Sequence, residues 1–183
     1  SCEHAVSLVS AQNVIASLDP SKYEPIAIFI DKQGHWHQIA VKALTDQTAE
    51  ELLTGANTME ISLAVPGALK AFVALPESHI DVVFPVLHGP FGEDGTVQGF
   101  LKLARMPFVG ADVCGSAVGM DKDIQKRILR DAGIPVAKFR TLYAAHRNKL
   151  DPQGLIDQMG LPLFVKPANL GSSVGISKAK SLE

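Results

Sequence analysis

The feature that most constrains this chain is a glycine-rich polar turn, His88-Gly89-Pro90-Phe91-Gly92-Glu93-Asp94-Gly95-Thr96. It follows an apolar run of strand length, residues 82–87, and precedes a helical pattern that begins near Val97. Ligands of α/β proteins bind beyond the carboxyl ends of strands, and glycines let a backbone approach a ligand closely. The turn is therefore a candidate site in which His88 supplies an ionisable group. The alternative is a tight turn in which Glu93 and Asp94 only complement the dipole of the next helix.

The rest of the chain alternates strand-like and helix-like segments, which is typical of an α/β fold with a parallel sheet. Leu8, Ala11, Ile15 and Leu18 form one face of a helix over residues 4–18. We expect further helices at 97–104, 121–133 and 152–160, strands at 26–30, 35–39, 107–110, 135–139 and 163–167, and a loop at 111–120. Residues 26–30 are almost wholly apolar, as in a strand buried on both faces. A change of character near residue 110 predicts two domains, 1–110 and 111–183.

Composition excludes several classes of protein. The 183 residues carry a formal net charge of -2, which gives no electrostatic reason to expect a nucleic-acid partner. The apolar runs are of strand length, so we expect no membrane span, and the polar start shows no signal sequence. Cys2 and Cys114 are too few and too far apart for a disulfide scaffold or a zinc site. With 46% hydrophobic residues, a globular cytoplasmic protein is the default expectation.

Two weaker signals lie in the first half of the chain. His35 and His37 would share one face of a strand, a spacing that suits a metal, but no third ligand is evident nearby, so we favour an interpretation without one. Glu3 stands at the start of a helix, where it either complements the dipole or holds a ligand's ammonium group. Residues 42–79 have mixed polarity and are typical of surface structure of variable design.

A second glycine-rich loop, Gly171-Ser172-Ser173-Val174-Gly175, follows the strand that ends at Lys166. Its N–H groups and hydroxyls suit phosphate oxygens, and a lysine adds a point charge. The loop has neither the Walker pattern nor the Rossmann fingerprint, and residues 174–177 look like the start of another strand. A flap over phosphates between two antiparallel strands and a plain hairpin turn both remain open. Lys122, judged alone, is an ordinary solvated lysine.

Taken together, four blocks resemble the D-alanine–D-alanine ligase family of the ATP-grasp superfamily, in order and context. The blocks are Glu3-His4-Ala5-Val6-Ser7, the 88–96 turn, Met120-Asp121-Lys122, and residues 165–175. The resemblance covers nearly the whole chain and is weakest in residues 42–79. It implies a pre-ATP-grasp parallel-sheet domain at 1–110, which binds substrate, followed by the first part of an ATP-grasp domain at 111–183.

The resemblance also implies roles for residues around the first substrate. Glu3 matches the carboxylate that orients the ammonium of the first D-alanine, and Val6 lines the same subsite. Ser7 helps to hold Glu3 in a hydrogen-bonded set. His88 lies beside that subsite, near the reacting carboxylate.

A second group of residues would bind ATP. Lys122 and Lys166 match lysines that contact its phosphates. Ser172, Ser173 and Val174 belong to the flap over them, and Ser172 reaches toward the substrate through the Glu3 network, so that Glu3 and Ser172 count as catalytic.

The implied activity is ATP-dependent ligation of two D-alanines through an acyl phosphate, for peptidoglycan synthesis, with Mg²⁺ or Mn²⁺ and as a homodimer. The chain lacks the family's first strand and everything after the flap, where the metal ligands are expected, beyond Glu183. We therefore expect a partial copy that is inactive alone. The alternatives are a D-alanine–D-lactate or D-alanine–D-serine ligase, or a truncated protein that only binds a ligand.

Overall fold

A computed structural model describes residues 3–46, 51, 59–60 and 80–182 of the chain. The chain divides into two compact units, unit 1 (Ser1–Ser116) and unit 2 (Ala117–Glu183). Most of the segment 42–79, with its expected surface character, lies outside the described residues, as does Cys2. In the part that is described, no helix is long and apolar enough to cross a membrane.

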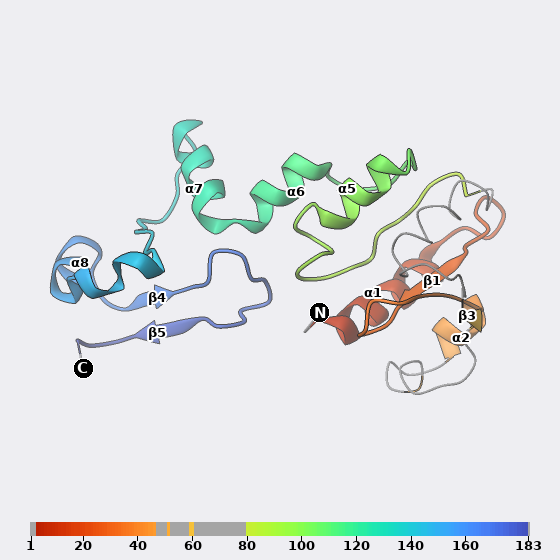
Figure 1. Cartoon of the computed structure of the whole chain (residues 1–183), viewed down its shortest axis with the longest axis horizontal. Helices are drawn as coiled ribbons and strands as arrows, with labels where there is room; N and C mark the ends of the chain where they lie inside the picture. The colour runs from red at the N-terminus through yellow and green to blue at the C-terminus, as the bar shows by residue number, and fades with distance from the viewer. Residues whose placement is uncertain (1–2, 47–50, 52–58, 61–79, 183) are drawn as a thin grey trace. The chain divides into compact units, whose positions relative to one another are not determined.

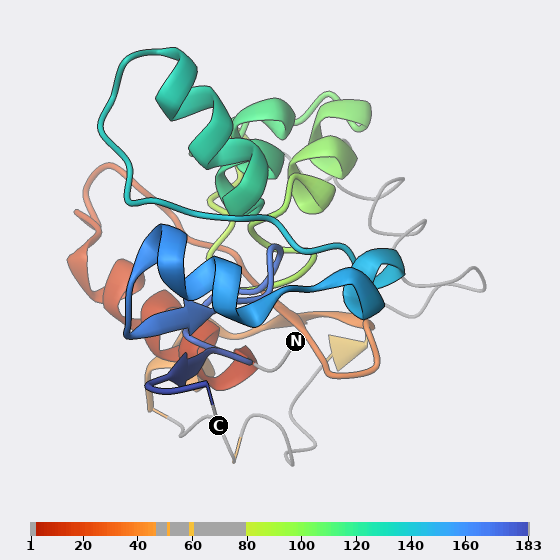
Figure 2. The ribbon, with the colours of Figure 1, turned by 90° about the vertical axis from the view of Figure 1, so that its left-hand side faces the viewer.

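The first core of unit 1 packs a helix against a β-hairpin. Helix α1 (His4–Ser17) lies beside strands β1 (Ala27–Ile30) and β2 (Trp36–Ile39), red and orange in Figures 1 and 2. The two strands pair antiparallel, with Ala27 opposite Ile39 and Ile30 opposite Trp36. Strand β3 (Met59–Glu60) pairs antiparallel with β2, and helix α2 (Val41–Asp46) follows β2. The buried residues of this core are Leu8, Ala27, Phe29, Ile39 and Leu44.

The second core of unit 1 gathers around helix α5 (Thr96–Leu103). Leu101 is its most buried side chain, at 1% exposure. Val83, which precedes the 88–96 turn, forms a parallel bridge with Phe108, which follows α5. This bridge fixes the chain segment that leads into the turn. The buried members are Val97, Leu101, Ala104 and Met106.

Unit 2 is built from short helices and one hairpin. Helix α6 (Val113–Met120) spans the boundary between the units and leads to α7 (Lys122–Asp131). A 3₁₀ helix, η2 (Ala144–Lys149), and helix α8 (Pro152–Met159) precede strands β4 (Leu163–Val165) and β5 (Ser177–Ala179). The two strands pair antiparallel and enclose the serine-glycine loop. No described residue of this unit is buried.

Several sequence predictions are confirmed. Leu8 is buried in α1, and Ala11 and Ile15 pack beside it, as the helical spacing predicts. Helix α7 lies within the expected helix over residues 121–133, and the Asp121 carboxylate caps it by accepting the N–H groups of Asp123 and Ile124. The 171–175 loop does lie between two antiparallel strands.

Other predictions are wrong. Residues 113–120 of the expected loop form α6, and residues 135–139 form no strand. Strand β1 alternates between buried and partly exposed residues, so it is not buried on both faces. Parallel pairing, in contrast, does occur at the bridge between Val83 and Phe108, although the ladders within the described residues are antiparallel.

Candidate functional site

The first candidate site joins the start of α1 to the 88–96 turn. Glu3 occupies the N-cap position of α1 and is 5% exposed, which is unusual for a carboxylate. Its backbone carbonyl accepts the Ser7 N–H at 3.1 Å and the Ser7 hydroxyl at 3.4 Å. Ser7 is therefore fixed on the first turn of the helix. Val6, on the same turn, leaves half of its side chain exposed.

His88 is held against α1 at two points. Its backbone N–H donates to the Ser7 Oγ at 2.9 Å, and its Nε2 lies 2.9 Å from the Ser10 Oγ. Glu3, Ser7 and His88, which the resemblance assigns to one subsite, are thus brought together within unit 1. Ser10 was missed. Its position one helical turn after Ser7, on the same face of α1, is the signal that could have identified it.

The acidic pair of the turn fixes the loop itself. The Glu93 Oε2 accepts the Gly89 N–H at 2.6 Å, and the two carboxylate oxygens of Asp94 accept the N–H groups of Phe91 and Thr96 at 2.9 and 3.0 Å. Burial acts to raise the pKa of Asp94, but these hydrogen bonds favour the ionised form and bring the pKa below its usual value. The two acids therefore rigidify the turn and leave His88 as its functional candidate.

Gly92 shows how closely the turn is packed. A Cβ at this position would lie 2.6 Å from the Leu87 Cβ and 2.8 Å from the Leu87 carbonyl oxygen. The side chain of Gln98, on α5, donates to the Gly92 carbonyl at 2.9 Å. The loop therefore packs between the preceding segment and the helix after it, which holds His88 in a defined place.

The second candidate site lies in unit 2, where α7 begins beside the serine-glycine loop. The Lys122 N–H donates to the Ala168 carbonyl at 3.0 Å. Its ammonium group donates to the Leu170 carbonyl and reaches the Ala168 carbonyl at 3.5 Å. Lys166 leaves β4 with its Nζ 6.0 Å from the centre of the Phe164 ring. Lys122 is therefore tied to the loop and is not an ordinary solvated lysine.

The loop itself has an unusual backbone. Ser172 and Ser173 both have positive φ, 45° and 61°, a conformation uncommon outside glycine. The Val174 N–H donates to the Gly171 carbonyl at 3.0 Å, which closes a tight turn. Gly175 combines a φ of 70° with a close approach to Pro167, since a Cβ would lie 2.9 Å from the Pro167 Cγ. Ser172, Ser173 and Val174 are exposed at the tip, where hydroxyl and N–H groups are accessible to an anion.

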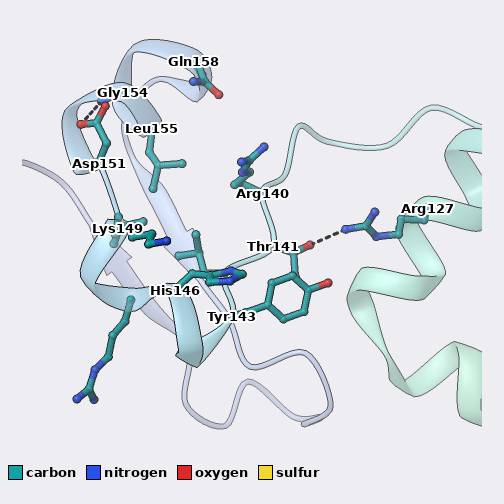
Figure 3. A pocket seen from close by; sticks show the side chains of 13 residues that line it. Arg127, Arg140, Thr141, Tyr143, His146, Lys149, Asp151, Gly154, Leu155 and Gln158 are labelled. Atoms are coloured by element: carbon teal, nitrogen blue, oxygen red, sulfur yellow. Dashed lines mark hydrogen bonds between the residues drawn. The ribbon is translucent and has the colours of Figure 1, made fainter.

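A separate cavity of about 810 Å³ lies between α7, η2 and α8 of unit 2, and the sequence analysis did not identify it. Figure 3 shows its basic wall, with Arg127 bonded to Thr141 at 3.3 Å. Arg127 also pairs with Asp123 at 2.7 Å, which raises the pKa of the guanidinium. None of the residues singled out from the sequence lines this cavity.

Comparison with protein families identifies two matching regions. A family model described as the D-ala D-ala ligase N-terminus matches residues 1–111. A second, described as the D-ala D-ala ligase C-terminus, matches residues 128–183.

Individual relatives agree with these models. D-alanine–D-alanine ligase A of Chromobacterium violaceum is 46% identical over 98% of this chain and 51% of its own length. The enzyme of the same name from Escherichia coli K12 is 44% identical over 100% of this chain and 52% of its own length. The chain thus spans about half the length of the curated relatives it matches.

Solved structures show the same similarity. The D-alanine–D-alanine ligase of Coxiella burnetii is 37% identical, with a TM-score of 0.84 over 99% of this chain and 54% of that one. The VanG D-Ala:D-Ser ligase of Enterococcus faecalis is 33% identical, with a TM-score of 0.71 over 97% of this chain and 52% of that one. These neighbours confirm the predicted α/β class.

Proposed function

The chain belongs to the D-alanine–D-alanine ligase family, and from this premise we propose that the protein joins two D-alanines in an ATP-dependent reaction that serves peptidoglycan synthesis. The observation that carries the proposal is the hydrogen-bonded set of Ser7, Ser10 and His88 beside the buried Glu3. It places a carboxylate, two hydroxyls and an imidazole together in unit 1, which is a suitable set of groups for a zwitterionic amino acid.

In this proposal, unit 1 supplies the pocket for the first D-alanine. Glu3 receives the ammonium group, because a buried carboxylate binds a cation more strongly than a solvated one. Val6 lines the subsite beside the substrate methyl group. Ser7 fixes both the Glu3 backbone and the His88 N–H, so the two groups keep their spacing during the reaction. His88 lies beside the substrate carboxylate.

Unit 2 would supply the groups that receive the phosphates. Transfer between two anions needs positive charge and N–H donors where negative charge accumulates. Lys122 and Lys166 provide the charge at the base of the loop. Ser172 and Ser173 provide exposed hydroxyl donors at its tip, and Val174 follows them in the turn that presents these hydroxyls. We propose that Ser172 is also a catalytic residue, as the family resemblance implies.

The reaction then has two steps. A carboxylate oxygen of the first D-alanine attacks the γ-phosphorus of ATP, which forms an acyl phosphate and releases ADP. The amine of the second D-alanine attacks the acyl carbon, the tetrahedral intermediate collapses with loss of phosphate, and the amine proton leaves to solvent or a base. The residues of this chain bind and orient the first D-alanine and stabilise charge on the phosphates.

A divalent cation such as Mg²⁺ or Mn²⁺ is expected to bind with ATP in this family. Mg²⁺ prefers carboxylate and phosphate oxygens. Within the described part of unit 2, no group of three His, Cys, Asp or Glu side chains lies close enough to share an ion. The described residues of unit 2 therefore do not fit a complete cation site, and we assign none of them to one.

A second candidate acceptor is D-serine, because the VanG D-Ala:D-Ser ligase resembles this chain over nearly its whole length. The first subsite is the same in both candidates, and only the nucleophile differs. We further propose that the protein acts as a homodimer in the cytoplasm, where ATP is available, on the basis of family membership alone.

The direct experiment incubates the full-length protein with ATP, Mg²⁺ and D-alanine and identifies the product by mass spectrometry while ADP release is followed. We expect D-alanyl-D-alanine and ADP in equal amounts. Competition between D-alanine, D-serine and D-lactate as acceptors separates the candidates. ADP release without a ligated product, or no reaction with any acceptor, would contradict the proposal.

A further inference from the structure

A cluster of two histidines and an aspartate occupies the turn between β1 and β2. The Asp31 Oδ2 lies 3.0 Å from the His35 Nδ1 and 3.2 Å from the His37 Nε2. Sequence spacing identifies the two histidines but not a third ligand. The turn over residues 31–34 brings Asp31 back onto the face that they share, since the His35 carbonyl accepts the Asp31 N–H at 2.9 Å.

The carboxylate of Asp31 is fixed in the orientation that this geometry needs. Its Oδ1 accepts the N–H groups of Gln33 and His35, both at 2.8 Å, which leaves Oδ2 directed at the two rings. Burial alone would raise the pKa of Asp31, but these backbone hydrogen bonds and those from the two rings outweigh it and lower the pKa to about 2.

The three side chains form a site that is closed on one side and open on the other. The His37 side chain is 10% exposed, that of Asp31 20% and that of His35 60%. The His37 ring packs against Phe29, with 6.0 Å between ring centres, so its orientation is set by the hydrophobic core. The exposed side at His35 gives a cation access from solvent and leaves room for water ligands.

We propose that Asp31, His35 and His37 form a binding site for a divalent transition metal of the zinc class. One ligand atom from each residue lies within 4.8 Å of the others. Ligand atoms at the corners of a zinc tetrahedron are separated by about 3.3 Å, so both contacts of Asp31 already match. The remaining separation is the one between the ligand nitrogens of His35 and His37. The His35 side chain is exposed, so its ring can move to shorten this distance. Two imidazoles and one carboxylate suit Zn²⁺, Ni²⁺ or Cu²⁺ better than Mg²⁺ or Ca²⁺.

The carboxylate of the ligand set has supporting hydrogen bonds of the kind that metal sites use. The N–H groups on the Asp31 Oδ1 hold the carboxylate in place, a support that commonly accounts for a large part of metal affinity. Metal binding would replace the two contacts between Asp31 and the rings and would join the ends of the β1–β2 turn. His4, at the start of α1, packs on Phe29 and bonds to the Ile30 carbonyl at 2.7 Å, so the site adjoins the helix that carries Glu3.

Calorimetric titration of the full-length, tag-free protein with ZnCl₂ tests the proposal without any readout of ligase activity. The variants are His35→Gln and His37→Gln, with His146→Gln in η2 as a control that removes an exposed histidine elsewhere. Because the His35 side chain is largely exposed, its variant should fold even if the buried His37 variant does not. Titration with CoCl₂ adds a visible absorption spectrum that reports the coordination geometry.

We expect one zinc ion per chain at this site, and binding at least roughly tenfold weaker in His35→Gln and His37→Gln. The control should bind as the unchanged protein does. Equal zinc affinity in the unchanged protein and in His35→Gln, or no binding at millimolar zinc, would show that the three side chains form a hydrogen-bonded cluster only.

Discussion

Replacing Ser7 by alanine tests whether α1 positions His88. The hydroxyl accepts the His88 N–H at 2.9 Å in a partly buried place, and it also donates weakly to the Glu3 carbonyl. In Ser7→Ala the His88 N–H loses its acceptor, which costs about 1–3 kcal/mol of stability. The higher helix propensity of alanine than of serine returns a few tenths of a kcal/mol. We therefore expect Ser7→Ala to lower the free energy of unfolding by about 1–2 kcal/mol.

The matched control is Ser17→Ala, at the other end of the same helix. The Ser17 hydroxyl only bonds to the Asn13 carbonyl at 2.8 Å on the exposed surface, so its loss should change stability by less than about 0.5 kcal/mol. Urea unfolding followed by the fluorescence of Trp36, the single tryptophan of the chain, reports on unit 1. Equal stability of the two variants would refute the idea that Ser7 holds the turn.

Three further predictions concern other parts of the structure. Gly92→Ala places a Cβ 2.6 Å from that of Leu87, so calorimetry should show destabilisation by about 1–3 kcal/mol, and an unchanged Tm would contradict the packing of the turn. Because the pKa of Asp31 is lowered to about 2 in the folded state, its contribution of about 2 kcal/mol is complete above the ordinary value near 3.8 and is lost as the pH falls towards 2. Asp31→Asn should therefore make the free energy of unfolding, measured by denaturant titration, depend less on pH in that range. Parallel pH profiles of the variant and the unchanged protein would exclude this contribution. In the full-length protein, Lys166→Ala should lower kcat by roughly a hundredfold, and near-normal turnover would mean that the lysine only packs on Phe164.

Local signals in the sequence predicted the helices well where a capping residue marks them. Asp121 before α7 accepts N–H groups of the first helical turn, as its sequence position predicts, and the structure shows that Asp151 does the same before α8. The sequence analysis did not predict helix α6, because Gly115 and Gly119 lower the helix propensity of this segment. Its own signal was Asp112, whose Oδ1 accepts the Cys114 N–H at 3.0 Å.

Long-range contacts were beyond the sequence analysis. Residues 135–139 have strand-like composition, but a strand needs a partner, and here the Phe139 ring lies against Lys126 and Arg130 of α7. The contact between Ser10 and His88 joins positions 78 residues apart, which no local pattern reveals. The resemblance of the motifs assigned Glu3, Ser7 and His88 to one subsite, and the structure adds the contacts of the Ser7 and Ser10 hydroxyls with His88.

The central claim is that Glu3 and its neighbours bind the first D-alanine, and the steady-state kinetics of Glu3→Gln in the full-length protein test it most directly. Glutamine keeps the shape of the buried side chain but removes its charge. We expect a higher KM for the first D-alanine and a lower kcat, with the KM for ATP nearly unchanged. Kinetic constants equal to those of the unchanged protein would remove Glu3 from the site and contradict the account.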